Sequence, residues 1–403
     1  MTAILFFILI ALFPLGVLTK FSILPSVHIA AADVVITLIL LASLKKIVLF
    51  LIHKKSTMIN LFILFFMTAL LGVLMNTDNL FQFTSSFSYL LRLYAYILLL
   101  IPLMDLPVKK LHEIRIGMII SGLVFILLGY VQYIYYPNLR NLFYLGWDEH
   151  LYRLFSTFLD PNFAGTFILL VLFLYISFFM EKIKFKDIKL NAFFTLPFLI
   201  IIPALFLTYS RSALLTGAVM TIIFLTLIGQ KKLIAVVCGM LILLLFILPK
   251  NFGGEGVNLM RTASIMTRLN SNSQAIKIFQ DNPIIGVGFN TLRFTQDKYN
   301  YLLKSEVLTS HAAAGFPNSF LVMLATTGVI GFSLFTVIFY KTTRHLYFEM
   351  KRRKDYFYFY ASILTVILGV LFNSMFENVL FYAPVMVWLV LLIGISKGVE
   401  KNN

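Results

Sequence analysis

The sequence predicts an all-α protein, a polytopic bundle of membrane-spanning helices. Of its 403 residues, 60% are apolar and only 12% are charged, whereas a soluble domain carries roughly 25% charged residues. Apolar stretches of about 20 residues, enough for a helix to cross about 30 Å of hydrocarbon, recur along the chain. A soluble domain of this composition would have too few polar groups to cover its surface, so that class is excluded.

About twelve stretches meet this length criterion. They cover residues 3–19, 30–50, 58–75, 87–104, 116–136, 161–180, 191–209, 212–229, 233–249, 316–340, 356–375 and 379–396. No basic residue precedes the first stretch, so we expect a retained first helix rather than a signal peptide. The sequence contains no internal repeat and no low-complexity tract, and we expect residues 1–403 to form a single integral membrane domain.

Lysine and arginine residues concentrate in alternate connections between these stretches. One set of connections is strongly basic and includes Lys45, Lys109, Lys184, Lys231 and Lys351. The other set is short and holds Lys20, Arg140, Arg153 and Arg211. Because basic connections stay in the cytoplasm, we place both termini there. The net charge of +16 therefore reports topology, and without a continuous basic stripe we expect no nucleic-acid partner.

One long polar segment, residues 249–315, lies on the opposite, extracytoplasmic side in this topology. A polar excursion between apolar spans is a common place for function in a membrane protein. Apolar residues recur in its first half at helical spacing, at Ile265, Leu269, Ile276 and Phe279. We therefore expect an amphipathic helix that lies on or dips into the outer leaflet, with Arg261 and Arg268 on one face.

A sharp turn is expected directly after this helix. Asn282 precedes Pro283, a pair that disfavours helix, and Gly286 and Gly288 then permit a tight change of direction. The rest of the loop leads to His311, just before the next apolar helix.

Two arginines outside the cytoplasm are candidates for binding an anion. Arg211, in the motif LTYSRSALLTG, sits at or just below the outer surface, where an arginine is costly without an anionic partner. Its planar guanidinium can bind phosphate bidentately. Arg268 is the second candidate. The alternatives are an Arg211 that snorkels and only sets topology, and an Arg268 on a solvated helix face.

Two further arginines are expected toward the outer side of the membrane domain. Arg92 lies within an apolar stretch, so it should face the bundle interior and either mark a pathway or pair with an acid. The acids that could pair with it are Asp33, Asp78 and Glu377. Arg153 precedes Asp160-Pro161-Asn162, where Asp160 is expected to cap a helix that begins at Pro161. We expect Arg153 to help line a cavity on the outer side.

The remaining reactive side chains are few. His311 is a candidate general base, because an imidazole titrates near neutral pH and can take a proton from a sugar hydroxyl. A structural or merely exposed histidine is the alternative. Asp148, Glu149 and His150 are adjacent, so their side chains point apart and we expect no metal site. The single cysteine, Cys238, lies in an apolar run and should be a small buried hydrophobe.

The chain resembles the O-antigen ligase and Wzy-type polymerase superfamily in four segments that follow one another in the expected order. RLFSTFLDPNFAGTFILL is similar to the family's arginine-led segment ending in Pro-Asn, and LTYSRSALLTG to its Ser-Arg element. TRLNSNSQAIKIFQDNPIIGVGFN is similar to its arginine, helix and Asn-Pro-x-x-Gly-x-Gly turn. NSFLVMLATTGVIG is similar to the element that opens the helix after the large outer loop.

This resemblance implies a glycosyltransferase of the GT-C type that needs neither metal nor another cofactor. Its donor would be a polyprenyl-diphosphate-linked oligosaccharide, used at the outer face of the bacterial cell membrane. Arg211 and Arg268 would stabilise the departing diphosphate, with Arg92 and Arg153 as further diphosphate-binding candidates.

The resemblance has one departure at the position of the base. Family members often carry histidine directly before the asparagine that corresponds here to Asn318, but this chain has Pro317. The base would then be His311, upstream of this helix start, or Glu377 at the outer end of the eleventh stretch.

Two functions stay open within this resemblance, and a third belongs to a different class. The resemblance favours a polymerase that joins repeat units of a capsule, exopolysaccharide or O-antigen, with flippase and chain-length regulator proteins as candidate partners. The first alternative is a ligase that moves finished glycan onto lipid A core or another acceptor. The second is a polysaccharide flippase or another transporter, a class often built from repeated halves, which this sequence lacks.

Overall fold

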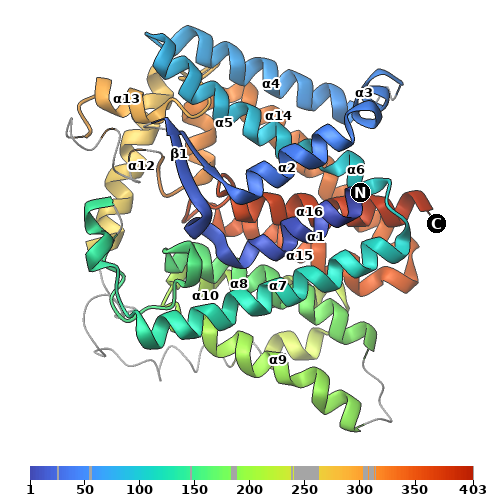
Figure 1. The fold of residues 1–403 in the computed structure, drawn as a ribbon. Helices are drawn as coiled ribbons and strands as arrows, with labels where there is room; N and C mark the ends of the chain where they lie inside the picture. The colour runs from blue at the N-terminus through green and yellow to red at the C-terminus, as the bar shows by residue number, and fades with distance from the viewer. Residues whose placement is uncertain are drawn as a thin grey trace.

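The computed structural model describes residues 1–24, 27–53, 57–145, 148–182, 188–236, 239, 263–302, 307, 313 and 315–402. Long helices run side by side through the molecule, and α12 (Ala263–Asp281) crosses their ends together with the short α13 (Leu292–Lys298) (Figure 1). Both chain termini lie at the opposite end of the bundle (Figure 1).

The first half of the chain contains most of the short elements. In order they are α1 (Thr2–Leu12), η1 (Phe13–Thr19), β1 (Lys20–Leu24), β2 (Val27–Ala30), α2 (Ala31–Ala42), α3 (Leu44–His53), α4 (Thr57–Asn76), α5 (Leu80–Leu98), α6 (Leu100–Met104), α7 (Val108–Tyr135), η2 (Arg140–Leu145) and η3 (Ser156–Phe158). The remaining elements besides α12 and α13 are α8 (Pro161–Lys182), α9 (Ile188–Leu207), α10 (Arg211–Leu227), α14 (Ser319–Arg352), η5 (Lys354–Tyr356), α15 (Phe357–Asn373) and α16 (Ala383–Asn402).

The predicted class, a polytopic helical membrane protein, is confirmed. Within the described residues, eight helical segments are long and apolar enough to cross a membrane, and α2 and α3 add a pair bent by 65°. The expected spans near 191–209 and 212–229 correspond to α9 and α10, which contribute shorter apolar helices. The expected span 233–249 lies mostly outside the described residues, as does Cys238.

Apolar side chains cover much of the outside of the bundle. Leu199 is 71% exposed, Ile134 68% and Ile52 66%. A soluble protein rarely presents such residues over a continuous surface, whereas hydrocarbon solvates them well. The exterior therefore agrees with the membrane class that composition predicts.

The core lies where α7, α8, α15 and α16 meet. The ring of Phe167 lies 4.9 Å from that of Phe125 and 4.7 Å from that of Trp388, centroid to centroid. Small residues let the helices approach closely, since a Cβ at Gly122 would lie only 2.4 Å from the Val171 side chain. Close packing through small residues is the usual basis of helix association in membranes, where water exclusion contributes little.

The turn after α12 is inserted beside a break in α14. At Gly328 the backbone of α14 leaves helical geometry. The N–H groups of Val287 and Gly288 donate to the carbonyls of Ala325 and Thr326, each at 2.9 Å, and Val329 N–H donates to the Pro283 carbonyl at 2.8 Å. The turn thus satisfies backbone groups that the broken helix leaves free, as apolar surroundings demand.

Glycine is required at this contact. Gly328 has φ of +61°, and a Cβ there would lie 2.2 Å from the Ile284 carbonyl oxygen. Gly286 and Gly288 of the turn also have positive φ, at +74° and +100°, conformations that side chains disfavour. The helix ends at Asp281, directly before Asn282 and Pro283, so the turn occurs where the sequence pattern places it.

The amphipathic helix α12 packs on the start of α14 through a face that spacing alone did not identify. Ala275 and Ile278 are fully buried, whereas Leu269 is 56% and Ile276 43% exposed. Two residues of the expected apolar stripe, Leu269 and Ile276, therefore face away from the protein. Its contact with the outer leaflet remains a prediction.

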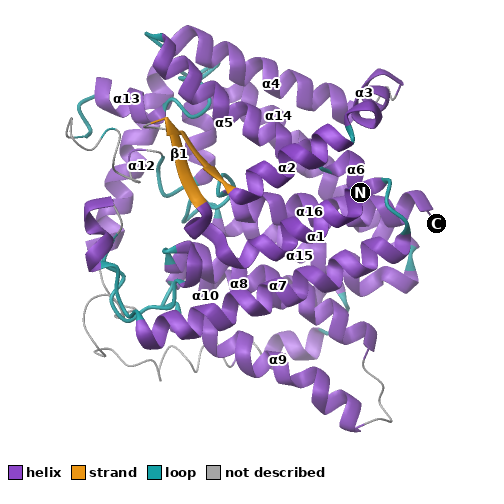
Figure 2. Cartoon of the chain, viewed as in Figure 1, coloured by secondary structure: helices purple, strands orange, loops and turns teal. Residues whose placement is uncertain are grey.

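A short antiparallel hairpin between the first two spans is not predicted by the sequence. In it β1 pairs with β2, with Lys20 opposite Ala30 and Ser22 opposite His28. The strands are only five and four residues long, too short for their alternation to stand out between the two flanking apolar spans. The hairpin, orange in Figure 2, lies toward the end of the bundle that carries α13.

Membrane orientation gives a direct prediction, because Cys238 is the single cysteine. In a Cys238→Ser background, Lys298→Cys on α13 should react with an impermeant thiol reagent in intact cells, and Lys354→Cys should not. Both lysines are exposed. Lys298 ends α13, whereas Lys354 follows Arg353, which donates to the Glu400 carbonyl near the C-terminus at 3.2 Å. Labelling of the second cysteine alone would reverse the orientation inferred from the distribution of lysine and arginine.

Candidate functional site

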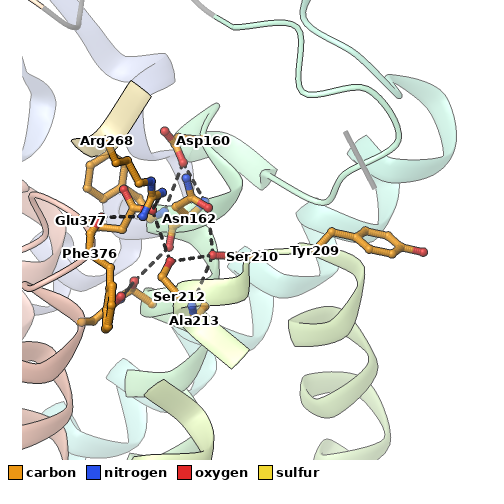
Figure 3. Close-up of polar contacts among 12 residues, drawn as sticks. Asp160, Asn162, Tyr209, Ser210, Ser212, Ala213, Arg268, Phe376 and Glu377 are labelled. Atoms are coloured by element: carbon orange, nitrogen blue, oxygen red, sulfur yellow. Dashed lines mark hydrogen bonds and ion pairs between the residues drawn. The ribbon is translucent and has the colours of Figure 1, made fainter. Parts of the chain in front are cut away.

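Polar groups from four separate segments meet near the α12 end of the bundle. The start of α8 supplies Asp160 and Asn162, and the α9–α10 corner supplies Ser210 and Ser212. Arg268 from α12 and Glu377 from the α15–α16 connection complete the group that Figure 3 shows as one network of polar contacts. We refer to these residues together with Arg211 and Arg153 as the arginine site.

The start of α8 is fixed by the cap that the sequence predicts. An Asp160 carboxylate oxygen accepts from the N–H groups of Asn162 at 2.7 Å and Phe163 at 3.3 Å, and the helix begins at Pro161. This confirms Asp160 as the N-cap and Pro161 as the first helical residue. The cap holds the Asn162 side chain at the edge of the arginine site.

The α9–α10 corner positions Arg211. Ser210 caps α10 by accepting from the N–H of Ala213 at 3.3 Å, and its hydroxyl donates to the Asn162 side-chain oxygen at 2.9 Å. Arg211 is the first residue of α10 and is half-buried. Tyr209 has a positive φ of 47°, and its ring points away from the polar contacts (Figure 3).

Arg153 ties this corner to α8. Its side chain is almost fully buried, with 4% exposed. Nε donates to the Thr208 carbonyl at 2.9 Å, and Nη2 lies 3.3 Å from the Asn162 side-chain oxygen and 3.4 Å from the Tyr209 carbonyl. In this structure Arg153 therefore orients the Arg211 segment. Its own contact with substrate remains a prediction.

Arg268 and Glu377 form an ion pair at the centre of the site. Nη1 of Arg268 also donates to the Phe376 carbonyl at 2.7 Å, while the hydroxyl of Ser212 donates to the same Glu377 oxygen as Arg268, at 3.2 Å. The Glu377 side chain is 9% exposed and that of Arg268 31%. The carboxylate is thus internal, and one side of the guanidinium reaches the surface.

Burial disfavours the charged form of Glu377 in this ion pair. Burial raises the pKa of Glu377; the Arg268 guanidinium opposes that rise, and the charge of Asp160 adds to it. The charges of Arg268 and Glu377 both act on the guanidinium of Arg211, so the two arginines are close in space. Three arginines here face two carboxylates, which leaves a positive excess for an anion.

The segment that carries Glu377 is held by the start of α14. Asn318 caps that helix, accepting from the N–H groups of Phe320 at 3.0 Å and Leu321 at 3.1 Å, and it donates to the Met375 carbonyl at 3.1 Å. The Ser319 hydroxyl donates to the Glu377 carbonyl at 3.1 Å. Asn318 therefore acts here as a structural link between α14 and the α15–α16 connection.

Two buried polar atoms next to Glu377 lack a hydrogen-bond partner among the described residues. They are Oδ1 of Asn378 and the hydroxyl of Tyr382, whose ring stacks on Phe163 at 4.1 Å. Buried polar groups are normally paired, so these two atoms are candidates for contact with a ligand. Sequence reasoning missed both, although each lies within five residues of Glu377.

Arg92 lies in a different place. It forms a two-pronged ion pair with Asp33, at 2.9 Å from Nε and 2.7 Å from Nη2. The acids that the sequence left open divide between separate partners, since Asp78 pairs with Lys298 and Glu377 with Arg268. Internal pairing, one of the two interpretations of Arg92, is therefore present, and the arginine site does not include it.

Other sequence candidates lie outside the described residues. They are His311 and Arg261. Of the triplet Asp148, Glu149 and His150, Glu149 forms an ion pair with Arg140.

One comparison with known proteins bears on this arrangement. Residues 196–336 match the family model described as O-Antigen ligase. The matched range contains Arg211, Arg268, the turn around Gly286 and the cap Asn318, whereas Arg153 and Glu377 lie outside it. No curated protein matches the chain. The match is consistent with the O-antigen ligase and Wzy-type polymerase superfamily and supports a membrane enzyme of that type, acting on lipid-linked glycans.

Proposed function

We propose that this protein polymerises polyprenyl-diphosphate-linked oligosaccharide repeat units into a surface polysaccharide. The observation that carries the proposal is the meeting of Arg211 and Arg268, from two distant segments of the matched range, beside the buried carboxylate of Glu377. The reaction would take place at the outer face of the bacterial plasma membrane, with both termini in the cytoplasm.

A lipid diphosphate suits this site for a physical reason. Its polyprenyl chain stays in the bilayer, so its charge is confined to the level where spanning helices end. Arg211 begins α10, and α12 crosses the helix ends with Arg268 partly exposed (Figure 1). Two planar guanidinium groups at that depth can hold the diphosphate by paired, charge-assisted hydrogen bonds.

The proposed step is a glycosyl transfer. The bond between the anomeric carbon of the donor sugar and the diphosphate oxygen breaks, and its electron pair leaves with the diphosphate. A hydroxyl oxygen of the acceptor sugar forms the new glycosidic bond, while its proton passes to a base. Arg211 and Arg268 would stabilise the charge that grows on the leaving group, an effect on the transition state.

Glu377 fits a second role in this step. Without substrate, it neutralises Arg268 through the ion pair. When a diphosphate binds, Arg268 would exchange the carboxylate for phosphate oxygens, leaving a buried carboxylate whose pKa is already raised. We propose His311 as the base for the acceptor hydroxyl, with Glu377 as the alternative.

Polymerase and ligase share this donor chemistry. The description of the matched family favours the ligase, while Pro317 in place of the family's frequent histidine tilts the proposal toward the polymerase. Flippase and chain-length regulator proteins are the partners that a polymerase of this kind would need. The fold itself would then be of the GT-C type.

A deletion strain tests the proposed function. Electrophoresis of its surface glycan should show single repeat units on the final acceptor, since only chain extension is lost. Full-length chains stranded on the lipid carrier would identify a ligase instead. Complementation with the intact chain should restore long polymers in the first case.

Metal independence is a further prediction, since arginines take the place of a cation at the diphosphate. Purified protein given lipid-linked repeat units should retain its polymerising activity in excess EDTA. Loss of activity on chelation, with recovery after adding a divalent ion, would show that the arginines alone do not neutralise the leaving group.

A further inference from the structure

A second group of basic side chains lies on elements that the proposed mechanism does not use. Lys20 begins β1, Arg92 comes from α5 and Arg293 from α13. The strand pairing sets Lys20 opposite Ala30, whose N–H donates to the Asp33 carboxylate at 2.8 Å. Lys20 therefore lies beside the Asp33–Arg92 ion pair. The charges of Lys20, Arg293 and Arg92 all act on His28 of β2, so Arg293 lies near the same strand. We call Lys20, Arg92 and Arg293 the hairpin cluster.

Arg92 is the fixed centre of the hairpin cluster. Besides its bonds to Asp33, it donates to the His28 carbonyl at 3.3 Å and lies 5.8 Å from the ring centre of Tyr89. Its Asp33 partner is also an acceptor for the Tyr96 hydroxyl. The charge of Arg92 is thus compensated, and its main effect is to hold the hairpin against α5.

Lys20 and Arg293 carry the positive charge of the hairpin cluster that Asp33 does not compensate. Within the described part of the chain, neither forms an ion pair, although Arg293 donates to the Val307 carbonyl. The Lys20 side chain reaches solvent, yet the surrounding protein and Arg92 lower its pKa to about 8. Burial likewise lowers the pKa of Arg293. Two cations without an acidic partner among the described residues therefore accompany the compensated Arg92, and a bound anion would supply the missing counter-charge.

The two basic groups share one end of the molecule. The hairpin and α13 lie toward the same end of the bundle as α12, away from both termini (Figure 1). Contacts also connect the intervening segments, since Ser86 of α5 donates to the Asn290 carbonyl just before α13 and the rings of Phe289 and Phe381 lie 5.7 Å apart. One continuous packed region therefore carries the hairpin cluster and the α15–α16 connection of the arginine site.

We propose that Lys20 and Arg293 bind the carrier diphosphate of the acceptor, while the arginine site binds that of the donor. This inference rests on the proposed polymerase function, because joining two lipid-linked units brings two carrier diphosphates to one enzyme. The acceptor contributes only a hydroxyl, and its own diphosphate bond stays intact. The hairpin cluster therefore binds without stabilising a transition state, and its loss should raise KM rather than lower kcat.

Binding stoichiometry tests the second site independently of catalysis. Native mass spectrometry of the purified full chain with polyprenyl diphosphate should show two bound molecules for the wild type. The double variant Lys20→Ala, Arg293→Ala should bind one, and so should Arg211→Ala. The matched control Lys298→Ala removes a cation from the same helix as Arg293 and should bind two. Two molecules on the hairpin double variant would overturn the proposal.

Kinetics with two acceptors test whether the ligand of the hairpin cluster is the carrier diphosphate of the acceptor. The same repeat unit is offered on polyprenyl diphosphate through a non-cleavable phosphonate link, or as an uncharged alkyl glycoside. In the hairpin double variant, KM for the first should rise about tenfold or more, with kcat and the second acceptor unchanged. Equal losses with both acceptors would overturn the proposal, as would displacement of one bound diphosphate by phosphatidylglycerol or phosphorylated lipid A.

Failure of the proposed function gives a different result. If the protein is a ligase, the deletion strain leaves full-length chains on the carrier, whatever the binding stoichiometry. Two bound diphosphates that fall to one in the hairpin variant would then still support the second site. A single bound diphosphate in the wild type, together with normal polymerisation, would refute the hairpin cluster alone.

Discussion

Arg211→Lys is expected to lower chain extension by about 100-fold or more, the usual effect of losing one donor to a developing anion. Lysine keeps the positive charge and can reach the outer surface as well as arginine does. It loses the planar fork that binds two phosphate oxygens at once. The corner around Ser210 fixes where residue 211 begins α10, so a point charge there cannot move to recover the geometry. Arg211→Ala should be inactive.

The measurement is glycan chain length together with the amount of protein in the membrane. Both variants should insert at normal levels and accumulate unpolymerised lipid-linked units, because the lost contact is to the leaving group. Arg140→Lys is the matched control, as Arg140 is another arginine of the predicted outer loops but pairs with Glu149 at an exposed site. Near-normal chains from Arg211→Lys would return Arg211 to a purely topological role.

The spans were predictable because each depends on a signal of about 20 apolar residues, which one or two polar exceptions do not erase. Asp160 and the turn at Gly286 were predictable for a different reason. A cap and a glycine turn are fixed by a few adjacent residues, so their geometry is local. The order of the family-like segments then indicated that Arg211 and Arg268 belong to one site.

Partners across the bundle could not be predicted in the same way. Arg92 has three acids at comparable depth in the sequence pattern, and only the packing of α2 on α5 selects Asp33. The contact of Ser212 with Glu377 joins α10 to the α15–α16 connection, and no spacing rule relates those positions. The hairpin was not predicted because its strands are only five and four residues long and lie directly between two apolar spans.

Glu377 was identified from the sequence, but its contacts were not. The sequence marks it as an acid at the outer end of a span and offers it as a base. The structure places it against Arg268 and Ser212, almost fully buried. A carboxylate with two donors on one oxygen is a weak base until those donors leave, which makes it first a partner for Arg268.

The assignment of the base is therefore best tested by comparing the activities of two variants. His311→Ala should abolish chain extension, since a positioned base contributes roughly 10²–10⁴-fold to such a proton transfer. Glu377→Gln should leave a measurable part of the activity. The amide keeps an oxygen that can accept from Arg268 and Ser212, so the arginine remains in place while the negative charge is lost.

Chain length and membrane level are compared for both variants, with His53→Ala as a control. His53 is exposed at the end of α3 and contacts only the Leu49 carbonyl among the described residues, so its loss should leave extension normal. A low pH should not rescue Glu377→Gln, because the amide does not titrate. If Glu377→Gln is inactive and His311→Ala extends chains, the carboxylate is the base. Proline at position 317 would then mark a site in which diphosphate binding releases Glu377 from Arg268 to accept the proton.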